Sequence, residues 1–443
     1  MSLVSGFSIP SYRVPVLARP DVCVIGGGAA GLAAAVAASR VGLSVVMVEK
    51  YGFCGGATVA GLSGTICGLF SSGTHPEQIV FGFAAEFHDR MARRGGVGKP
   101  LAFGKTMLVP HESVVWKETA DCLLQQQQVR ILYHTHFLRA FQQENRIDAL
   151  LVQAKEGQAV IRPKLVVDAS GDAEVVHSLS GETTLGRKGV VQTPTMIFRM
   201  GGVDIDAFLK IDPAEIDGQI AEAHQSGAFR LPRRHVYLFP MPNGHEVLCN
   251  MTSITRPDGS VPLGISSDDI SFAEVEGRIQ ARSYATFLRE RFPAFAHAYL
   301  ADTGAQVGIR QTRSIVGKAR LTNDDVLKAR KVKGAATLSA WPIEAHSSQG
   351  VSISYIENDS YDIPFETLIP GVATNLLVAG RCMSAEHEAL ASARVTAQCF
   401  GMGYAVGAAC GLLAQENMLA QDLSGEQVAD WMHAQKLKTA TER

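Results

Sequence analysis

The stretch that decides the fold is residues 21–50, DVCVIGGGAAGLAAAVAASRVGLSVVMVEK. It predicts a strand over residues 22–25, a glycine turn, a helix of small residues and a second strand. The uninterrupted apolar run of the first strand is typical of a parallel strand buried on both faces. The turn has the pattern Gly26-x-Gly28-x-x-Gly31. In such a turn the glycines allow a sharp exit from the strand, close approach of a diphosphate, and close packing of the helix against the sheet.

An acidic residue completes this pattern. Glu49 ends the second strand, 18 residues after Gly31, where a carboxylate can accept both hydroxyls of an adenosine ribose. The helix N-terminus would present its unpaired N–H groups and its dipole to the diphosphate. Because glycine turns are common, the alternative is a glycine-rich connection that binds no ligand. The flanking strands and the acid favour a dinucleotide site.

The composition indicates a globular protein that binds small molecules. The 443 residues allow two or three domains and a large core. Charged residues make up 19% and the net charge is −2, so no basic excess points to nucleic acid or anionic lipid. The eight cysteines are scattered without a CxxC pair. This argues against a zinc or iron–sulfur site and predicts no metal, with reduced thiols in a cytoplasmic protein.

One segment resembles a membrane span. Residues 395–415 are uncharged and long enough to cross a bilayer. They also contain Gly403, Gly407 and Gly411 at intervals of four, a smooth stripe that suits close helix packing inside a soluble domain. We therefore expect no membrane segment.

Three later segments add to the predicted dinucleotide site. A Gly55–Gly56 pair follows the second strand, and residues 168–172, DASGD, follow an apolar strand. Residues 375–380, NLLVAG, form a further apolar strand, and residues 391–396 open the last long helix. That helix beginning is a second place where negative charge is stabilised. Two such ends, more than 300 residues apart, fit FAD better than NAD.

The pattern changes after about residue 186, which indicates an inserted domain. Three strands and a long helix are expected, at residues 193–202, 234–240, 246–253 and 267–292. We expect an α/β protein in which a discontinuous Rossmann-like FAD/NAD(P)-binding domain, residues 20–185 and 365–430, carries an inserted α+β substrate domain, residues 186–364.

Six motifs occur in order between about residues 21 and 412: GGGAAGLAAA, VEKYGFCGGAT, VVDASGDAEV, GIRQTRSIVG, YDIPFETLIP and VAGRCMSAEHEALASARV. Together they resemble the FAD-dependent oxidoreductase family, whose fold is shared with glutathione reductase. More distantly, they resemble the flavoprotein subunits of fumarate reductase and succinate dehydrogenase. Many relatives have Gly-Asp where this chain has Gly380-Arg381, and many have an aliphatic residue where this chain has Cys54.

The resemblance implies an FAD site that runs from adenine to flavin. The first turn would hold the diphosphate, Glu49 the adenosine ribose, Phe137 the adenine through its backbone, and the N–H groups of residues 393–395 the flavin pyrimidine edge. The implied residues are Gly26, Gly28, Gly31, Glu49, Lys50, Gly55, Gly56, Ala57, Thr58, Phe137, Ala169, Gly171, Gly380, Arg381, Ala393, Arg394 and Val395.

Four residues are candidates for the chemistry. His346, two residues after Glu344, is the first choice for an acid or base, and His387 the second, because the pKa of histidine lies near neutrality. Each could equally be a structural histidine. Arg310 and Arg313 could bind a carboxylate with bidentate geometry; on a strand they would face opposite sides, and on a turn they could converge. Their alternative role is an ion pair between the two domains.

The sequence therefore predicts an FAD-dependent oxidoreductase that exchanges a hydride between flavin N5 and a small polar molecule, with a carboxylate-bearing substrate as one option. Three alternatives remain. One is an NAD(P)-dependent dehydrogenase, which would use only the first strand–helix–strand unit, and another is a flavoprotein with a structural or interaction role. The third is a membrane-attached electron-transfer subunit, which would need residues 395–415 exposed. The sequence does not identify the electron acceptor, and it allows a homo-oligomer.

Overall fold

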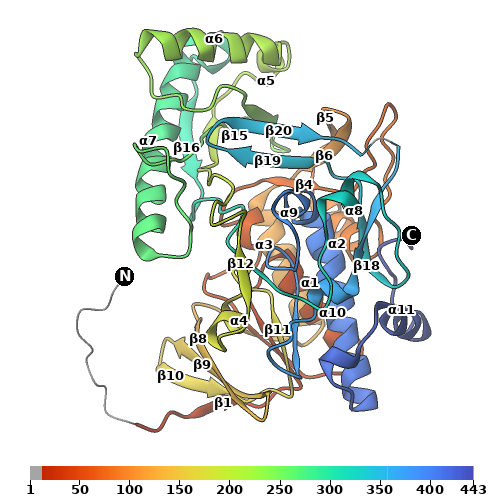
Figure 1. Cartoon of the computed structure of the whole chain (residues 1–443). Helices are drawn as coiled ribbons and strands as arrows, with labels where there is room; N and C mark the ends of the chain where they lie inside the picture. The colour runs from red at the N-terminus through yellow and green to blue at the C-terminus, as the bar shows by residue number, and fades with distance from the viewer. Residues whose placement is uncertain (1–11, 357, 443) are drawn as a thin grey trace.

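The centre of the molecule is a five-stranded parallel sheet (Figure 1). The computed structural model describes residues 12–356 and 358–442. Every neighbouring pair in the sheet is parallel, and the order is β22 (Leu376–Val378), β11 (Leu165–Asp168), β2 (Val22–Ile25), β3 (Val45–Val48) and β7 (Arg130–Leu132). The predicted α/β class is confirmed.

Successive residues of the central strands enter two different hydrophobic cores. Val22 and Val24 of β2 pack in one core, whereas Cys23 and Ile25 pack in the other. Side chains alternate between the faces of a strand, so a strand covered on both sides must be apolar throughout. This explains the continuous apolar runs in the sequence.

Helices cover one face of the sheet. α1 (Ala29–Arg40) packs along α10 (Thr396–Glu416). The helices around this pair are α2 (Gly82–Ala92), α3 (Ser113–Gln126), α9 (His387–Ala393) and α11 (Gly425–Ala434). The glycine stripe of α10 makes the close contact: a Cβ on Gly403 would lie 2.0 Å from the carbonyl oxygen of Ala30, and one on Gly407 2.1 Å from that of Ala34.

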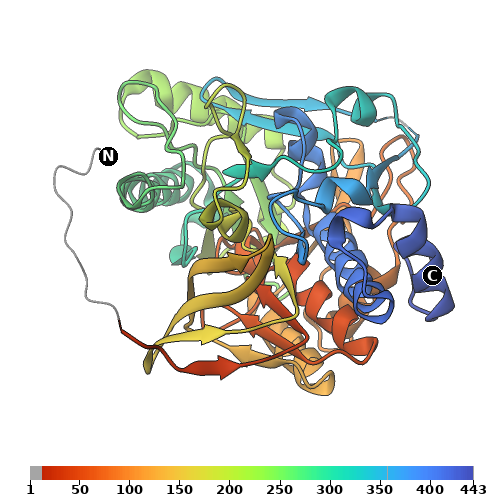
Figure 2. The same cartoon turned by 60° about the horizontal axis from the view of Figure 1, so that its bottom comes forward.

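A second sheet covers the opposite face. Its order is β1 (Val16–Ala18), β10 (Gly157–Ile161), β9 (Arg146–Ala154) and β8 (His136–Gln143). Figure 2 shows this sheet at the front, beside the short helix α4 (Glu174–Ser178). The apolar stretch of residues 160–169 is not one strand: Pro163 separates β10 from β11, and the two strands belong to different sheets. Proline cannot donate to a sheet, so the interruption was visible in the sequence.

A smaller unit has its own core, formed between Met196 and Ile309. Its antiparallel sheet has the order β14 (Tyr237–Pro240), β15 (Glu246–Asn250), β13 (Phe198–Gly201) and β16 (Tyr299–Thr303). Its helices are α5 (Ile205–Phe208), α6 (Pro213–Ser226), α7 (Ser267–Arg291) and the 3₁₀ helix η2 (Pro293–Phe295). We call this part the smaller unit and the remainder the larger unit; the smaller unit forms the upper left of Figure 1.

The chain returns to the larger unit earlier than predicted. Residues 186–364 were assigned to one inserted domain, but Leu321, Ile343 and Tyr361 pack in the core of the larger unit. The elements in question are β17 (Arg313–Ile315), α8 (Asn323–Leu327), β18 (Ala335–Ser339), β19 (Ile343–Ser347), β20 (Gly350–Ser354) and β21 (Tyr361–Pro364). Short hairpins are common to both kinds of domain, so local sequence does not separate them.

The remaining short elements complete the larger unit. Three antiparallel strands, β4 (Thr65–Cys67), β6 (Thr106–Pro110) and β5 (Leu101–Phe103), form one sheet, and β12 (Thr183–Leu185) pairs with β17. The 3₁₀ helices of this unit are η1 (Gly56–Thr58), η3 (Phe365–Leu368) and η4 (Ala420–Asp422).

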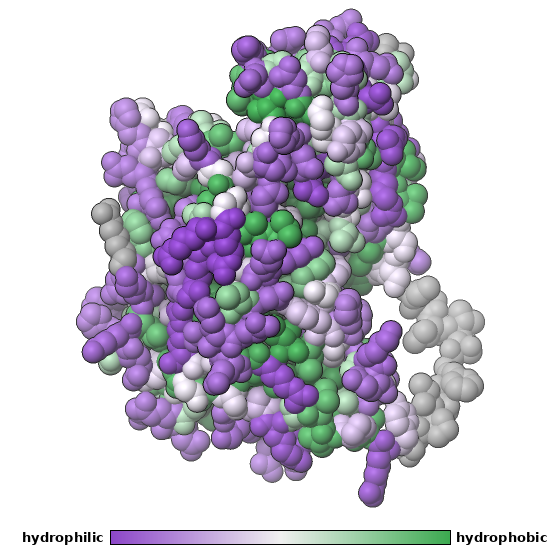
Figure 3. Space-filling view, turned by 180° about the vertical axis from the view of Figure 1, so that it is seen from behind, coloured by the Kyte–Doolittle hydropathy of each residue, from purple (hydrophilic) through white to green (hydrophobic). Residues whose placement is uncertain are grey.

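α10 is long and apolar enough to cross a membrane by length and composition, but 83% of its most apolar window is buried inside the protein. Core helices pass the same test, so its composition is weak evidence for a span. On the face seen from behind in Figure 3, hydrophobic residues are interspersed among hydrophilic ones.

Candidate functional site

The glycine turn after β2 places the N-terminus of α1 at the carboxyl edge of the parallel sheet. Gly26 has a φ of +97°, in the region that favours glycine, and a Cβ on Gly31 would lie 1.8 Å from the carbonyl oxygen of Gly26. The chain itself therefore requires these two glycines. Gly28 differs, because its Cβ would meet nothing closer than the Cα of Gly56 at 3.8 Å. Space is left open beside Gly28, as a bound diphosphate needs.

A second glycine loop lies against the first. Gly55 and Gly56 have φ values of +144° and +51°. The N–H of Gly55 donates to the carbonyl oxygen of Gly27 at 2.8 Å, and Gly28 forms a parallel bridge with Gly55. Two glycine segments separated in the sequence thus form one wall.

Glu49 ties these loops together. Its side chain is buried; Oε2 accepts a hydrogen bond from the N–H of Gly27 at 2.6 Å and Oε1 from that of Tyr51 at 2.8 Å. Burial raises the pKa of Glu49, although both N–H groups favour the charged form. The carboxylate therefore braces the turn as well as lining the cleft.

The loops line a cleft that encloses about 1940 Å³ of space, part of it open to solvent. The predicted cofactor residues that line it are Gly26, Gly28, Glu49, Lys50, Gly55, Gly56, Ala57, Thr58, Phe137, Ala169, Gly171, Gly380, Arg381, Arg394 and Val395. Gly31 packs beneath the turn, and Ala393 is fully buried in α9. Thr396, at the start of α10, lines the same cleft as Gly28, so both predicted helix beginnings face one cavity.

The second helix beginning differs in detail from the prediction. A single helix was expected to open over residues 391–396, but α9 ends at Ala393 and α10 starts at Thr396, with Val395 as its N-cap. The N–H of Arg394 donates to Leu390 at 3.2 Å. This N–H group therefore has a partner within the chain, and its contact with a ligand stays a prediction; Arg394 itself lines the cleft.

Residues from both units line one part of the cleft. We use "chamber" for the part lined by Thr195, Ile197, Tyr237, Asn250, Arg310, Trp341, Glu344, His346 and Arg394. These residues come from several separate segments of the chain. The hairpin β19–β20, which carries two of them, extends beside β15 of the smaller unit in Figure 1.

His346 and Glu344 form a pair at the chamber wall. His346 Nε2 lies 3.0 Å from Glu344 Oε1, and the histidine side chain is 5% exposed. Burial and the neighbouring Arg310 lower the pKa of His346, so the ring is neutral at physiological pH. Burial alone would raise the pKa of Glu344, but His346, Arg310 and Arg394 lower it, so the carboxylate is ionised.

Arg310 and Arg313 do not converge. Arg310 is buried and lines the chamber; it donates from Nη1 to the carbonyl oxygen of Thr193 at 2.6 Å. Arg313 starts β17 and donates to the carbonyl oxygen of Asp172 at 3.4 Å, in a separate hollow. The backbone straightens into a strand at Arg313, which turns that side chain away.

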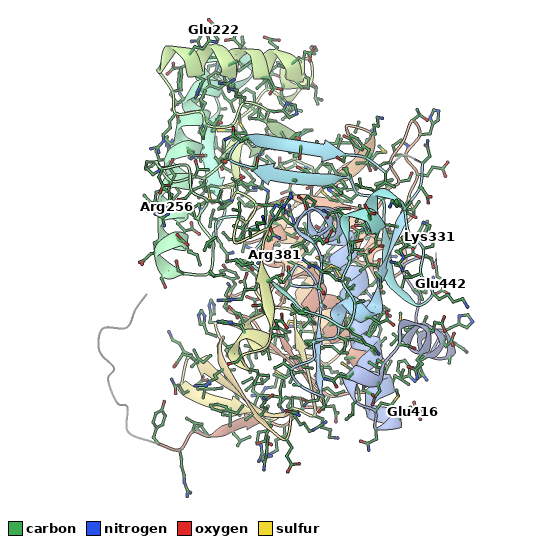
Figure 4. All side chains as sticks on the ribbon, in the orientation of Figure 1. Glu222, Arg256, Lys331, Arg381, Glu416 and Glu442 are labelled. Atoms are coloured by element: carbon green, nitrogen blue, oxygen red, sulfur yellow. The ribbon has the colours of Figure 1, made fainter. Side chains whose placement is uncertain are left out.

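The two remaining predicted residues, Arg381 and His387, lie in different places. Arg381 lines the cleft and pairs with Asp172 at 2.9 Å; Figure 4 labels it near the centre of the molecule, where the two units meet. His387 is half-buried at the start of α9 and is not part of the chamber wall.

Sequence reasoning missed other polar residues at the chamber. Asn250, at the end of β15, accepts hydrogen bonds from Arg233 Nη1 at 3.0 Å and Arg310 Nη2 at 3.4 Å. Gln192 accepts from Arg394 Nη2 at 3.0 Å. The adjacent pair Arg233-Arg234 in an otherwise strand-like segment was the available signal.

Comparison with protein families shows that the model described as FAD dependent oxidoreductase matches residues 21–432. No curated protein matches the chain.

Solved structures with some similarity include a geranylgeranyl bacteriochlorophyll reductase-like protein from Thermoplasma acidophilum. It has a TM-score of 0.49 and 14% identity over 95% of this chain and 84% of that chain. Another is an anhydrotetracycline hydroxylase from Streptomyces rimosus, with a TM-score of 0.44 and 10% identity over 94% of this chain and 66% of that chain. Neither similarity bears on the substrate.

Proposed function

Because this chain belongs to the family of FAD-dependent oxidoreductases, we propose that it oxidises or reduces a small carboxylate-bearing molecule in the chamber, by hydride transfer. The enzyme class and the FAD cofactor follow from the family. The substrate class and the hydride step are our proposal, as are a cytoplasmic location and a small molecule as the substrate.

The residues of the cleft fit FAD. Gly28 leaves room for the diphosphate beside the N-terminus of α1, whose N–H groups and dipole stabilise phosphate. Glu49 and Lys50 stand at the end of β3, where an adenosine ribose is held in such folds. When bound, FAD supplies the redox step, in which its N5 exchanges a hydride with a substrate C–H.

The observation that carries the proposal is the environment of Arg310. This buried guanidinium lines the chamber, and its hydrogen bonds go to neutral oxygens of Thr193 and Asn250. A buried charge whose hydrogen bonds all go to neutral groups is costly, and a substrate carboxylate would compensate it. Arg310 therefore binds and orients the substrate.

His346 holds the proton that accompanies the hydride. Its neutral ring can accept a proton from a substrate hydroxyl or amine, and the ionised Glu344 at 3.0 Å stabilises the resulting imidazolium. The chamber also limits water: Trp341 is 1% exposed and stacks on Phe103 with ring centroids 5.3 Å apart. Low local polarity strengthens the charged contacts.

The test is an anaerobic screen of small carboxylic acids and neutral polyols. Bleaching of the flavin absorbance shows which of these compounds reduce the flavin. We expect at least one acid to bleach the flavin, and Arg310→Gln to raise its KM at unchanged flavin content. Bleaching by neutral polyols alone, or by none of the compounds, would contradict the proposal.

A further inference from the structure

The chamber contains more positive than negative charge. Two arginines line it, Arg310, which is 8% exposed, and Arg394, which is partly buried, and Arg233, which is 5% exposed, hydrogen-bonds to Asn250 of the chamber wall from behind. We call these three residues the arginine cluster. The carboxylate that faces them is Glu344, whose side chain is 14% exposed.

The hydrogen bonds of the arginine cluster go to neutral acceptors. Arg233 donates from Nε to the carbonyl oxygen of His235 at 2.7 Å, and from Nη1 to Asn250 Oδ1 at 3.0 Å. Arg310 donates to the same Asn250 oxygen at 3.4 Å. One amide oxygen thus joins two guanidinium groups, at a position where an aspartate would have neutralised one of them.

Arg394 is bound in the same way. Its Nη2 donates to Gln192 Oε1 at 3.0 Å, while its Nε and the Nε2 of Gln192 have no hydrogen-bond partner among the described residues. Arg310 donates to the carbonyl oxygen of Thr193, the residue that follows Gln192 in the chain. Because consecutive Cα atoms lie about 3.8 Å apart, Arg394 and Arg310 are anchored at adjoining points of one segment.

The charges in this region do not balance. Three guanidinium groups lie near one ionised carboxylate, Glu344, since burial and Arg310 keep His346 neutral. Asp172 does not compensate the arginine cluster, because it pairs with Arg381. Among the residues that the structure describes here, two positive charges are left over. Charges taken out of water without a counter-charge are strongly unfavourable, so a ligand that brings two negative charges would bind well.

We propose that the substrate is a dicarboxylate, with Arg310 binding one carboxylate and Arg394 the other. Both arginines line the cleft, whereas Arg233 lies behind Asn250. Asn250 determines the specificity, because its neutral amide leaves two guanidinium groups uncompensated. The inference rests on the proposed function in one respect, that the chamber is the substrate site.

Binding to the oxidised holoenzyme tests the charge requirement without turnover. The probes are malonate, succinate, glutarate and adipate, each compared with its monoamide and its diamide. Binding is followed by the shift of the flavin absorbance and by thermal stabilisation, which grows with ligand concentration over Kd. We expect at least one diacid to bind ten or more times more tightly than its monoamide. Equal affinity of diacids and monoamides, or no binding by any diacid, would overturn the inference.

Asn250→Asp tests the specificity residue. The new carboxylate should weaken binding of the best diacid at least tenfold and leave its monoamide within about threefold, so that the preference shrinks at least about threefold, or about 0.7 kcal/mol. Asn250→Ser, which stays neutral, is the control and should retain the preference. Unchanged discrimination in Asn250→Asp would refute the assignment. If that variant does not retain flavin, Arg394→Gln replaces it and should lose the preference for diacid over monoamide; retention of that preference would equally refute the inference.

The two proposals fail separately. A diacid that binds tightly but never reduces the flavin would contradict the proposed reaction and leave the charge requirement standing. A monocarboxylate that binds as tightly as any diacid and reduces the flavin would support the reaction and overturn the dicarboxylate.

Discussion

Replacing Gly28 by alanine should separate cofactor binding from folding. Gly28 has φ −66° and ψ −177°, which alanine adopts without strain, and the new Cβ would meet only Gly56 Cα at 3.8 Å. At such positions Gly→Ala stabilises a protein by about 0.4–1 kcal/mol through the unfolded state. The apoprotein of Gly28→Ala should therefore be as stable as wild type or slightly more stable.

FAD affinity should change in the opposite direction. The Cβ would occupy the space through which the diphosphate approaches the N-terminus of α1. If this displaces one hydrogen bond to a charged group, the loss is about 1.5–3 kcal/mol, which corresponds to roughly 10- to 150-fold weaker binding. FAD titration by quenching of flavin fluorescence measures the affinity, and urea denaturation of the apoprotein measures the stability.

Two other glycines provide matched controls. Gly31→Ala should lower both stability and FAD affinity, because its Cβ would lie 1.8 Å from the Gly26 oxygen. Gly218→Ala, in α6 with nothing within 4 Å of the added Cβ, should stabilise the fold and leave FAD binding unchanged. Wild-type FAD affinity in Gly28→Ala, or an apoprotein as unstable as that of Gly31→Ala, would refute the assigned role of the turn.

Three further predictions concern positions outside the chamber. Arg313→Ala should leave KM and flavin content unchanged and reduce the free energy of unfolding by at most about 1 kcal/mol, because it removes a contact with Asp172; a higher KM in steady-state kinetics would contradict this. Burial and Asp172 raise the pKa of Glu174 to about 7 from 4.5. The folded state therefore keeps the Glu174 carboxyl protonated to a higher pH than the unfolded state does. The resulting stabilisation is complete below pH 4.5 and is lost as the pH rises through about 7. Glu174→Gln should flatten this decline in urea melts across that range, and an unchanged slope would exclude the assignment. Gly403→Ala should push α10 away from Ala30 and lower the free energy of unfolding by about 1–3 kcal/mol. A free energy of unfolding equal to that of the wild type, measured by urea denaturation, would contradict this prediction.

The cofactor half of the cleft was predictable because backbone groups build it. The turn at Gly26–Gly31, the Gly55–Gly56 pair and Glu49 lie within one short stretch, and each depends on a residue type with few substitutes. Glycine at positive φ and an acid at a strand end are local requirements, so they are visible in the sequence. The same reasoning missed the break between α9 and α10 at Arg394, since neither proline nor glycine marks it.

The chamber could be predicted only in part, because side chains from distant segments build it. His346 and Arg310 were identified from their chemistry, but Arg313 was grouped with Arg310 by spacing alone. Whether two residues three apart converge depends on where the strand begins, which in this chain is Arg313 itself. Asn250 carried no signal, because a single amide at the end of a strand is ordinary until its neighbours are known.

The two halves of the cleft stabilise negative charge by different means, and this difference decides what each can select. The glycine loops offer backbone N–H groups, which bind a phosphate group in any chain that adopts the turn. The chamber offers guanidinium groups whose own acceptors, Thr193, Asn250 and Gln192, are neutral. Changing one of these side chains from amide to carboxylate would alter the charge available to a substrate without moving the backbone that holds the cofactor. If the chamber binds the substrate as we propose, substitutions at positions such as Asn250 would change the choice of substrate and leave the predicted FAD-binding turn the same.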